Sequence, residues 1–266
     1  MTVALSADGG DELFAGYSRY HAVANLHGKT EKIPAFMRQI AAQGTRVAQG
    51  FSGKKYNQSR SQRLLKGKAI LQDNSPVSIL QNQVQRLVDS DLQRLLLKQG
   101  KAINQQHFTT KNDPMNAVLA WEYRNYMMDD ILVKVDRATM SVALEGREPF
   151  LDQRIAEWVA QIPFAQKYRD GNLKDILKKI THRYIPRDIM ERPKMGFGVP
   201  VLQWLKTDLR DLTETYLDEQ RIREAGIFNP DVVAQQKNAF LAAESTSSFE
   251  WLWFLLMFEM WREKWM

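Results

Sequence analysis

The stretch Val3-Ala4-Leu5-Ser6-Ala7-Asp8-Gly9-Gly10-Asp11-Glu12 decides the fold, because a short apolar run leads directly into a turn with two glycines and three acids. The apolar run is typical of a buried strand, and the acids that follow are typical of the first turn of a helix. In an α/β sheet, ligands bind outside the carboxyl ends of the strands. The sequence therefore predicts a strand–turn–helix unit with a ligand site in the turn.

The turn carries features that suit an anionic ligand. Gly9 and Gly10 permit a positive φ and a close approach of the backbone, and the N–H groups at the start of the following helix attract anions. Asp8, Asp11 and Glu12 crowd the same turn, which makes sense if a divalent cation lies between their carboxylates and phosphate groups. The alternative is structural, since acids also stabilise the first turn of an ordinary helix.

The rest of the chain is predicted to be mainly α-helical, and Val3–Leu5 is the only segment that clearly indicates a strand. Because the backbone groups of a buried strand must be paired, either further strands escape detection or the rest of the sheet lies in a segment absent from this chain. The second interpretation makes the chain the C-terminal portion of a larger α/β domain. The expected helices span residues 11–26, 76–87, 89–97, 113–128, 129–143, 155–162, 173–180, 202–217, 230–243 and 249–264, the last being a core element rich in tryptophan. Asp113 followed by Pro114 is typical of an N-cap and the first helical position, so a helix is expected to start there.

The composition excludes several classes of protein. Of the 266 residues, 44% are hydrophobic and 26% are charged, and none is cysteine, which excludes a disordered chain, disulfides and zinc–thiolate sites. The longest near-continuous apolar run, Trp251–Phe258, is far shorter than the roughly 20 residues that span a bilayer. Residues 1–5 lack the features of a signal peptide. We therefore expect a cytoplasmic protein that does not interact with a membrane.

The net charge of +6 is unevenly distributed. Residues 29–70 contain ten lysines and arginines and one acid, which gives this segment a charge of +9. Such a block is typical of a solvated helical surface facing an acidic partner domain, or of a surface that binds nucleic acid or another anion. Few aromatic residues and no nucleic-acid motif accompany the charges, so nucleic acid is not the favoured partner.

Three later segments also carry charged residues in suggestive positions. Lys134 and Arg137 lie three residues apart and share one face of a predicted helix. The segment Leu144–Asp152 ends this helix, turns at a proline and restarts with an aspartate at the N-cap position. Lys194 lies in the Gly- and Pro-rich segment Arg192–Pro200, where a lysine can clamp a phosphate group. Ion pairs within each segment, and a plain exposed loop for the third, are the structural alternatives.

In this order and spacing, the four segments resemble the asparagine synthase (glutamine-hydrolysing) family. The family patterns are close to S-G-[DE]-G-[GA]-D-E-x-F-x-G-Y, L-V-K-V-D-R-x-[ST]-M, L-E-x-R-x-P-F-L-D and K-x-G-F-G-V-P. They correspond here to Ser6–Tyr17, Leu132–Met140, Leu144–Asp152 and Lys194–Pro200, with Ala7 in place of the usual glycine.

The resemblance implies a synthetase domain built on a parallel sheet of the adenine nucleotide alpha hydrolase type. Family members carry a glutaminase domain that starts with a cysteine and a synthetase domain that opens with an S-G-G-x-D-S pyrophosphatase loop, and this chain contains neither sequence feature. Residues 1–266 are therefore expected to form a partial synthetase domain, its C-terminal portion with one N-terminal strand retained. The glutaminase domain and the pyrophosphatase-loop segment would be missing.

The same resemblance implies an ATP-dependent amidation. The carboxylate of aspartate, or of a related sugar or amino acid, would be activated as an acyl-adenylate, and ammonia derived from glutamine would displace AMP. The implied cofactors are ATP and Mg²⁺. The implied partners are the small-molecule carboxylate, ammonia or glutamine through the missing glutaminase domain, and the missing N-terminal half of the synthetase domain. We expect this chain alone not to catalyse the reaction; the alternative, from another functional class, is a non-catalytic helical remnant that binds an anion or a protein partner.

The resemblance also assigns roles to individual residues. Lys194 would stabilise negative charge that develops on the phosphate, and Tyr17 lies where a related enzyme has a proton-relay tyrosine. Asp11 would hold Mg²⁺. The residues implied to contact ATP or pyrophosphate are Ser6, Ala7, Asp8, Gly9, Gly10, Lys134, Arg137 and Lys194. The residues implied to line the substrate pocket are Glu12, Asp136, Glu145 and Arg147.

Overall fold

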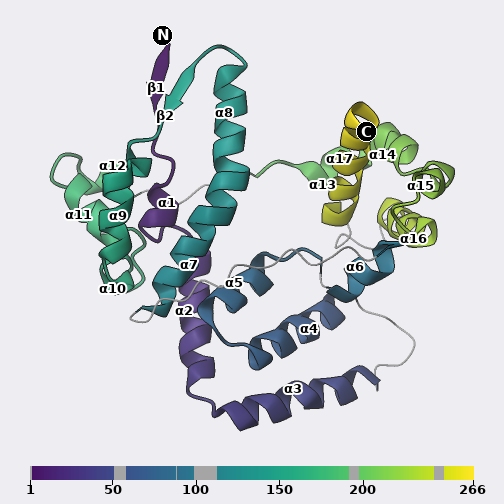
Figure 1. The fold of residues 1–266 in the computed structure, drawn as a ribbon, viewed down its shortest axis with the longest axis horizontal. Helices are drawn as coiled ribbons and strands as arrows, with labels where there is room; N and C mark the ends of the chain where they lie inside the picture. The colour runs from purple at the N-terminus through teal and green to yellow at the C-terminus, as the bar shows by residue number, and fades with distance from the viewer. Residues whose placement is uncertain (1, 51–57, 88, 99–112, 192–197, 243–248) are drawn as a thin grey trace. The chain divides into compact units, whose positions relative to one another are not determined.

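A computed structural model of the chain describes residues 2–50, 58–87, 89–98, 113–191, 198–242 and 249–266 (Figure 1). The chain forms two compact units, each assembled from several segments. The first unit comprises Met1–Gly44, Lys68–Gln83 and Gln105–Lys194. The second comprises Thr45–Gly67, Val84–Asn104 and Met195–Met266.

The expected strand is present in the first unit, and it has a partner that the sequence analysis did not predict. Strand β1 (Val3–Leu5) pairs in parallel with β2 (Glu145–Arg147), and Val3 lies opposite Glu145. Backbone hydrogen bonds of 2.9 Å extend the ladder at both ends, from Glu145 N to Thr2 O and from Ser6 N to Arg147 O. The sequence Glu-Gly-Arg of β2 carries no alternation of apolar and polar residues, which is why it escaped detection. The fold is therefore mostly helical with a small parallel sheet, in which a second strand accompanies the N-terminal strand that the sequence indicated.

Most of the remaining described chain is helical, and α8 (Leu132–Met140) packs against β2. Before residue 90, the helices that belong wholly or partly to the first unit are α1 (Gly10–Leu13), α2 (Ser18–Glu31), α3 (Ala35–Gly50), α4 (Gln58–Gln72) and α5 (Pro76–Val84). Those from residue 114 onwards are α7 (Pro114–Glu122), the π-helix η1 (Tyr123–Ile131), α8 (Leu132–Met140), the 3₁₀-helix η2 (Pro149–Leu151), α9 (Gln153–Gln161), α10 (Phe164–Lys167), α11 (Asp175–Thr181) and α12 (Arg187–Met190).

The helix expected over residues 11–26 is broken into α1 and α2. Ala15 has a φ of 57°, in the left-handed region, and the Gly16 N–H donates to Asp11 O at 2.8 Å. A Cβ atom at Gly16 would lie 1.9 Å from the Asp11 carboxylate. The turn between the two helices therefore requires a glycine, and the prediction of one continuous helix was wrong.

Two helix starts follow the predicted capping chemistry. The Asp113 side chain accepts a hydrogen bond from Met115 N at 3.1 Å at the start of α7, and Asp152 accepts one from Arg154 N at 2.9 Å at the start of α9. Both caps are confirmed. The two helices expected over residues 113–143 are joined without a break, because η1 continues α7 directly into α8 (Figure 1).

A small hydrophobic cluster holds the N-terminal turn in place in the first unit. Leu13 and Phe14, at the end of α1, are buried together with Val159 and Ile162 from α9 and the residue that follows it. The Phe14 and Phe150 rings meet edge to face with their centroids 5.7 Å apart. The cluster therefore fixes α1 against α9 and η2, directly below the end of β1.

The second unit has its own core, built around the C-terminal helix. Its helices are α6 (Asp89–Leu95), α13 (Val201–Lys206), α14 (Arg210–Tyr216), α15 (Glu219–Ala225), α16 (Pro230–Leu241) and α17 (Phe249–Trp265). Trp251, Leu252, Leu255 and Leu256 of α17 are buried in this core, which confirms the predicted role of the last helix. The helix expected over residues 202–217 is interrupted, because Thr207 leaves the helical conformation after α13. Among the described residues, no helix is long and apolar enough to cross a membrane.

Candidate functional site

The glycine turn after β1, Ser6–Gly10, packs closely against the segment that follows β2. Gly9 has a φ of 87°, and a Cβ atom there would lie 2.3 Å from Leu151 Cδ2. A Cβ atom at Gly10 would lie 3.4 Å from the Phe150 ring. The contact with η2 therefore requires a glycine at position 9, whereas at position 10 it leaves room for a Cβ atom.

Parallel pairing brings the first and third motifs to one edge of the sheet. Because β1 and β2 run in the same direction, the chain leaves both strands at their carboxyl ends on the same side, which is where α/β sheets bind ligands. The glycine turn leaves β1 there, and η2 follows β2 there. Two motifs that are far apart in the sequence thus form one candidate site.

The three acids in the glycine turn and at the start of α1 have different surroundings. The Ser6 hydroxyl donates to the Asp8 carboxylate. Asp11 lies on α1 with its Oδ1 atom 3.1 Å from Lys174 Nζ, and both side chains are about 29% exposed. Glu12 is only 2% exposed. The turn therefore contains a partly exposed carboxylate beside a lysine and a second carboxylate that faces the interior.

The sequence analysis missed Lys174. It adopts a left-handed conformation with a φ of 56° immediately before α11, and its side chain reaches back to the turn that carries Asp11. The pattern around it was interpreted only as an amphipathic helix over residues 173–180. An isolated lysine at the start of a helix gives no sequence signal for a contact with a residue so distant in the chain.

Tyr17 lies next to Glu12, as a hydrogen-bond donor. Its hydroxyl donates to Glu12 Oε1 at 2.7 Å. Burial, and after it the hydrogen bond to Glu12, raise the pKa of the Tyr17 phenol well above its usual value. Tyr17 therefore keeps its proton at neutral pH, and the Glu12 carboxylate accepts it as a hydrogen bond.

A second buried carboxylate lies close to this pair, and the sequence analysis missed it. Glu122, the last residue of α7, is 1% exposed and accepts hydrogen bonds from Arg19 Nη2 and, at 3.3 Å, from the Tyr20 hydroxyl. Burial raises the pKa of the Glu122 carboxyl, and the charge of Arg19 opposes this shift. The available signal was a charged residue that follows the apolar run Ala117–Trp121.

The charged residues of the second motif and of β2 pair with neighbours in the chain. Lys134 Nζ lies 2.8 Å from Asp130 Oδ1 within the helical run, and Arg147 Nε donates to Glu145 Oε1 at 2.7 Å. Glu145 and Arg147 are more than half exposed. These are the ion pairs considered above as structural alternatives, so the local geometry supports that interpretation for these four residues.

The remaining predicted site residues are either exposed or outside the described part of the chain. Asp136 and Arg137 lie exposed on α8, which packs along β2 (Figure 1). Lys194 lies outside the described residues, as does most of the segment around it. The structure therefore brings together the glycine turn, Tyr17 and the third motif, and it places the α8 charges on a neighbouring surface.

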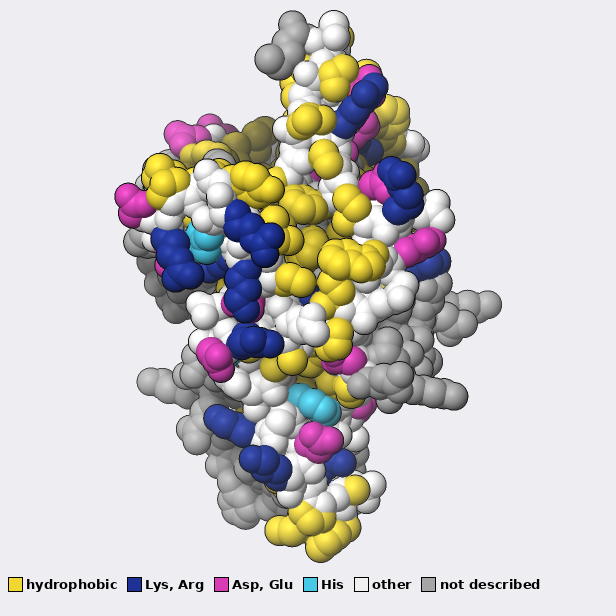
Figure 2. All heavy atoms as spheres, turned by 90° about the vertical axis from the view of Figure 1, so that its left-hand side faces the viewer, with side chains coloured by type: hydrophobic (Ala, Val, Ile, Leu, Met, Phe, Trp, Pro, Cys, Tyr) yellow, Lys and Arg dark blue, Asp and Glu magenta, His cyan; other side chains and the backbone are white. Residues whose placement is uncertain are grey.

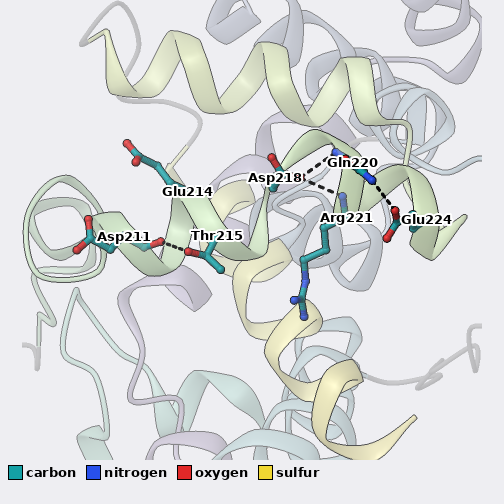
Figure 3. A pocket seen from close by; sticks show the side chains of 7 residues that line it. All are labelled: Asp211, Glu214, Thr215, Asp218, Gln220, Arg221 and Glu224. Atoms are coloured by element: carbon teal, nitrogen blue, oxygen red, sulfur yellow. Dashed lines mark hydrogen bonds between the residues drawn. The ribbon is translucent and has the colours of Figure 1, made fainter.

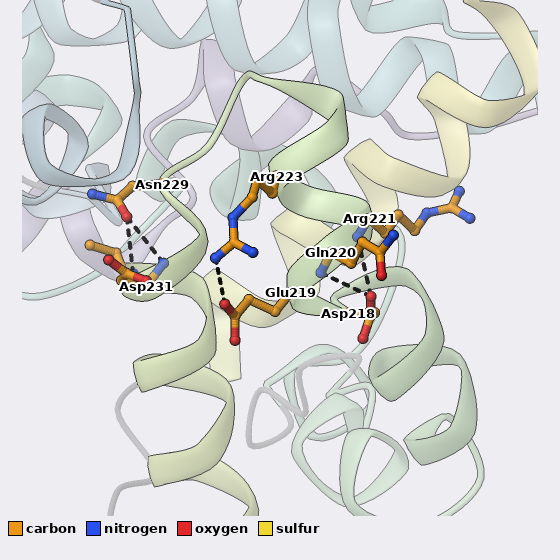
Figure 4. A network of polar contacts seen from close by, with 8 residues as sticks. Asp218, Glu219, Gln220, Arg221, Arg223, Asn229 and Asp231 are labelled. Atoms are coloured by element: carbon orange, nitrogen blue, oxygen red, sulfur yellow. Dashed lines mark hydrogen bonds and ion pairs between the residues drawn. The ribbon is translucent and has the colours of Figure 1, made fainter.

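An open pocket in the second unit has a structural explanation. It is lined by α14 and α15 residues, which are Asp211, Glu214, Thr215, Asp218, Gln220, Arg221 and Glu224 (Figure 3). Asp218 caps α15 by accepting from Gln220 N and Arg221 N, and Gln220 Nε2 donates to Glu224 (Figure 4 shows the caps and the neighbouring Arg223–Glu219 pair). These contacts are helix caps and pairs one turn apart, so the pocket does not add a functional site.

Comparison with known proteins agrees with the motifs. The family model described as Asparagine synthase matches residues 1–263. Asparagine synthetase [glutamine-hydrolyzing] 1 of Bacillus subtilis is 28% identical over 270 residues, which cover 98% of this chain and 40% of that protein. The Bacillus subtilis asparagine synthetase [glutamine-hydrolyzing] 3 is 36% identical over 31% of this chain and 15% of its own length. The Rattus norvegicus asparagine synthetase [glutamine-hydrolyzing] is 30% identical over 43% of this chain and 21% of its own length. No solved structure matches the chain significantly.

Proposed function

The chain belongs to the asparagine synthase family, and from this premise we propose that it supplies part of the active site for ATP-dependent amidation of a carboxylate. The carboxylate of aspartate, or of a related sugar or amino acid, attacks the α-phosphate of ATP and pyrophosphate leaves. Ammonia derived from glutamine then displaces AMP and forms the amide. The single observation that carries this proposal is the parallel pairing of β1 with β2, which joins the first and third family motifs at one edge of the sheet.

The proposal concerns an enzyme larger than the chain itself. The chain spans about 40% of the length of the first Bacillus subtilis relative. It contains no S-G-G-x-D-S sequence, the loop that would contribute further contacts to adenine and phosphate. We therefore propose that this chain is an incomplete synthetase half and that it does not catalyse the reaction alone.

Several groups at the site suit pyrophosphate or the phosphates of ATP. Ser6 to Gly10 present backbone in a tight turn, and Lys174 adds a cation beside the same turn. Arg137 adds exposed positive charge on α8, and Lys134 lies on the same helix, where its ammonium is paired with Asp130. Lysine and arginine are the usual partners of phosphate oxygens. We also propose, from its motif alone, that Lys194 is a phosphate ligand that stabilises the negative charge developing on the phosphate.

The residues present fit a magnesium ion bound jointly with a nucleotide. Among the described residues, no group of three potential ligand side chains could hold a metal ion by itself. Mg²⁺, however, usually takes only one or two carboxylates together with substrate phosphates. Asp11 is a partly exposed carboxylate on the turn, so it would hold the ion, which would neutralise charge on the phosphates when bound. The Lys174 ammonium contacts this carboxylate in the present structure, so the lysine and the metal ion would have to share it.

The proposed substrate-side residues divide into buried and exposed groups. Glu12 is buried and already accepts a hydrogen bond from Tyr17, so its role would be to fix the Tyr17 hydroxyl as a donor. Asp136, Glu145 and Arg147 are exposed. These three are accessible to a substrate or to a further segment of the synthetase domain.

Exposed apolar residues around the sheet support a proposal about the missing partner. Leu5 at the end of β1 is 74% exposed, and Val142 just before β2 is 73% exposed. Hydrophobic side chains also gather on the exposed surface that Figure 2 shows. We propose that the remaining strands of the synthetase domain cover β1 and its neighbourhood. Ammonia would come from a glutaminase domain, and the use of ATP and glutamine suggests the cytoplasm as the compartment.

The test is an assay of pyrophosphate release with aspartate, ammonia, ATP and Mg²⁺. The chain alone is expected to give no release above a control without enzyme. The chain purified together with a polypeptide that carries the S-G-G-x-D-S segment of a relative is expected to release pyrophosphate. Pyrophosphate release by the chain alone would overturn the proposal that the chain is an incomplete synthetase half. Absence of release from the assembled complex, with sugar carboxylates also tried, would favour the non-catalytic remnant.

A further inference from the structure

A buried polar cluster connects the glycine turn to the helical run that carries the second motif. Arg19 and Tyr20 come from α2, Glu122 is the last residue of α7, and Tyr126 lies in η1. Glu122 is 1% exposed, and a buried carboxylate is costly unless it is paired and hydrogen-bonded. Arg19 and Tyr20 supply these partners. None of these residues was assigned a role by the sequence motifs.

The ion pair fixes the orientation of the Arg19 side chain. One guanidinium nitrogen contacts Glu122, and the guanidinium carbon lies 4.0 Å from the centroid of the Tyr17 ring and 4.8 Å from that of the Tyr126 ring. The Tyr17 and Tyr126 rings meet edge to face with their centroids 6.0 Å apart. A planar guanidinium held at one end can stack on aromatic rings in only a few orientations. The contact with Glu122 therefore limits where the guanidinium can lie against the two rings.

The Tyr17 ring in turn carries the contact to the candidate site. Its hydroxyl donates to the buried Glu12 carboxylate at 2.7 Å. Helix α1, which contains Glu12, has only four residues and no side-chain cap, and the break at Ala15 and Gly16 separates it from α2. So short a helix has few hydrogen bonds of its own, and side-chain contacts from elsewhere must orient it.

We propose that Glu122 is a positioning residue for the glycine turn: it orients Arg19, and Arg19 holds the Tyr17 ring against Glu12. The inference rests on the proposed function only in that the turn is taken to be the active site. Glu122 is also the residue from which η1 continues towards α8. The same buried carboxylate therefore ties the first motif to the helical run that bears Lys134 and Arg137.

The test uses the full chain labelled with 3-fluorotyrosine and observed by ¹⁹F NMR. The chain has eight tyrosines, and Tyr17→Phe and Tyr126→Phe identify the two relevant resonances. In Glu122→Gln, which keeps the shape but removes the charge, both resonances are expected to move by more than their linewidth. Glu122→Asp, which keeps the charge, is expected to return them towards the wild-type positions. Arg19→Lys keeps a positive charge but loses the planar group, and it is expected to displace them as Glu122→Gln does.

Glu259→Gln is the matched control, because it removes an equivalent pair in the second unit. Glu259 is 0% exposed and lies 2.7 Å from Arg262, which is 24% exposed, against 1% and 27% for Glu122 and Arg19. This variant is expected to leave the Tyr17 and Tyr126 resonances in place. Circular dichroism reports whether each variant is folded, and Arg19→Lys decides the question if Glu122→Gln does not fold.

Two results would overturn the inference. One is a folded Glu122→Gln or Arg19→Lys variant with an unchanged Tyr17 resonance. The other is a Glu259→Gln variant that displaces the resonance equally, since the effect would then be a general loss of stability. The readout needs no nucleotide, so failure of the pyrophosphate-release assay would refute the proposed function and leave this inference standing.

Discussion

Lys167 shows most directly how the fold changes the chemistry of a single side chain. It is 2% exposed, and its ammonium donates to Asn116 Oδ1 at 3.1 Å. Burial lowers the pKa of this lysine from 10.5 to about 8, and the nearby charge of Asp113 only partly opposes the shift. The folded state therefore releases a proton that the unfolded state still holds over a wide range of pH.

We predict that the contribution of Lys167 to stability rises with pH. Below pH 8 the lysine is charged in both states, and the folded state bears the cost of the buried charge. Between pH 8 and 10.5 the folded state loses the proton first, so the free energy of unfolding increases, by about 3 kcal/mol if the full shift is realised. The measurement is the difference in unfolding free energy between the wild type and Lys167→Met, by urea denaturation at a series of pH values. A difference that stays constant from pH 7 to 10.5 would contradict the prediction.

Gly9 allows a second prediction at the scale of one residue. Gly9→Ala would place a methyl group 2.3 Å from Leu151 Cδ2 in a backbone conformation with a φ of 87°. Gly171 is a matched control, since its φ is 83° and its Cβ position has no neighbour within 4 Å. Strain of the left-handed conformation costs about 1–2 kcal/mol in both variants, and only Gly9→Ala adds the clash. Urea midpoints should therefore fall further for Gly9→Ala, and equal losses would show that the turn does not need this close contact.

The sequence could predict residues whose partners lie nearby in the chain, and it could not predict the others. Asp113 and Asp152 were identified as caps because a cap bonds to the backbone two or three residues later. Lys174 was missed because its contact with Asp11 exists only after the chain has folded. Glu122 was missed for the same reason, although a carboxylate next to an apolar helical run requires a buried partner. The predicted roles of Asp11 and Tyr17 at the site stay predictions.

At the scale of elements, the cap of α7 also fastens a second helix. Besides Met115 N, the Asp113 carboxylate accepts a hydrogen bond of 2.7 Å from Phe164 N at the start of α10. The contacts described for the Asp152 carboxylate, by contrast, lie within the first turn of its own helix, at Arg154 and at the Ile155 backbone. The two caps look alike in the sequence but differ in what they hold together.

We predict that Asp113→Ala destabilises the first unit more than Asp152→Ala does. Loss of an N-cap costs about 1 kcal/mol, and leaving the partly buried Phe164 N–H unpaired adds about 1–3 kcal/mol. Asp152→Ala should cost only the free energy of the lost N-cap, about 1 kcal/mol. Thermal or urea unfolding of the two variants measures the difference. Equal destabilisation would mean that the Phe164 contact contributes nothing.

Elements without a periodic pattern were the ones that the sequence missed. Strand β2 has three residues, two of them charged, and neither its length nor its composition distinguishes it from a turn. The break between α1 and α2 depends on the close approach of Asp11 and Lys174 to Gly16, which no local rule contains. Helix α7, by contrast, was predicted because Asp113 and Pro114 mark a helix start, and this signal lies within the element itself.

At the scale of the whole molecule, the small sheet leaves apolar surface uncovered. Leu5 and Val142, 74% and 73% exposed, lie at the two ends of a sheet with two strands in the described chain. Open strand edges and exposed apolar patches favour association with other chains. We predict that the isolated chain self-associates or binds a hydrophobic dye, and that Leu5→Lys reduces both effects. Light scattering and dye fluorescence measure them, and a monomer that binds no dye would contradict the prediction.

The pairing of β1 with β2 also has a consequence for folding during synthesis on the ribosome. The two strands are separated by roughly 140 residues, and a ribosome adds about 5–20 residues per second. The first strand therefore leaves the exit tunnel roughly 7–30 seconds before β2 does. During this interval Val3–Leu5 is an apolar segment without its parallel partner. Chaperones that bind such segments should engage the chain in this interval and release it once β2 has emerged.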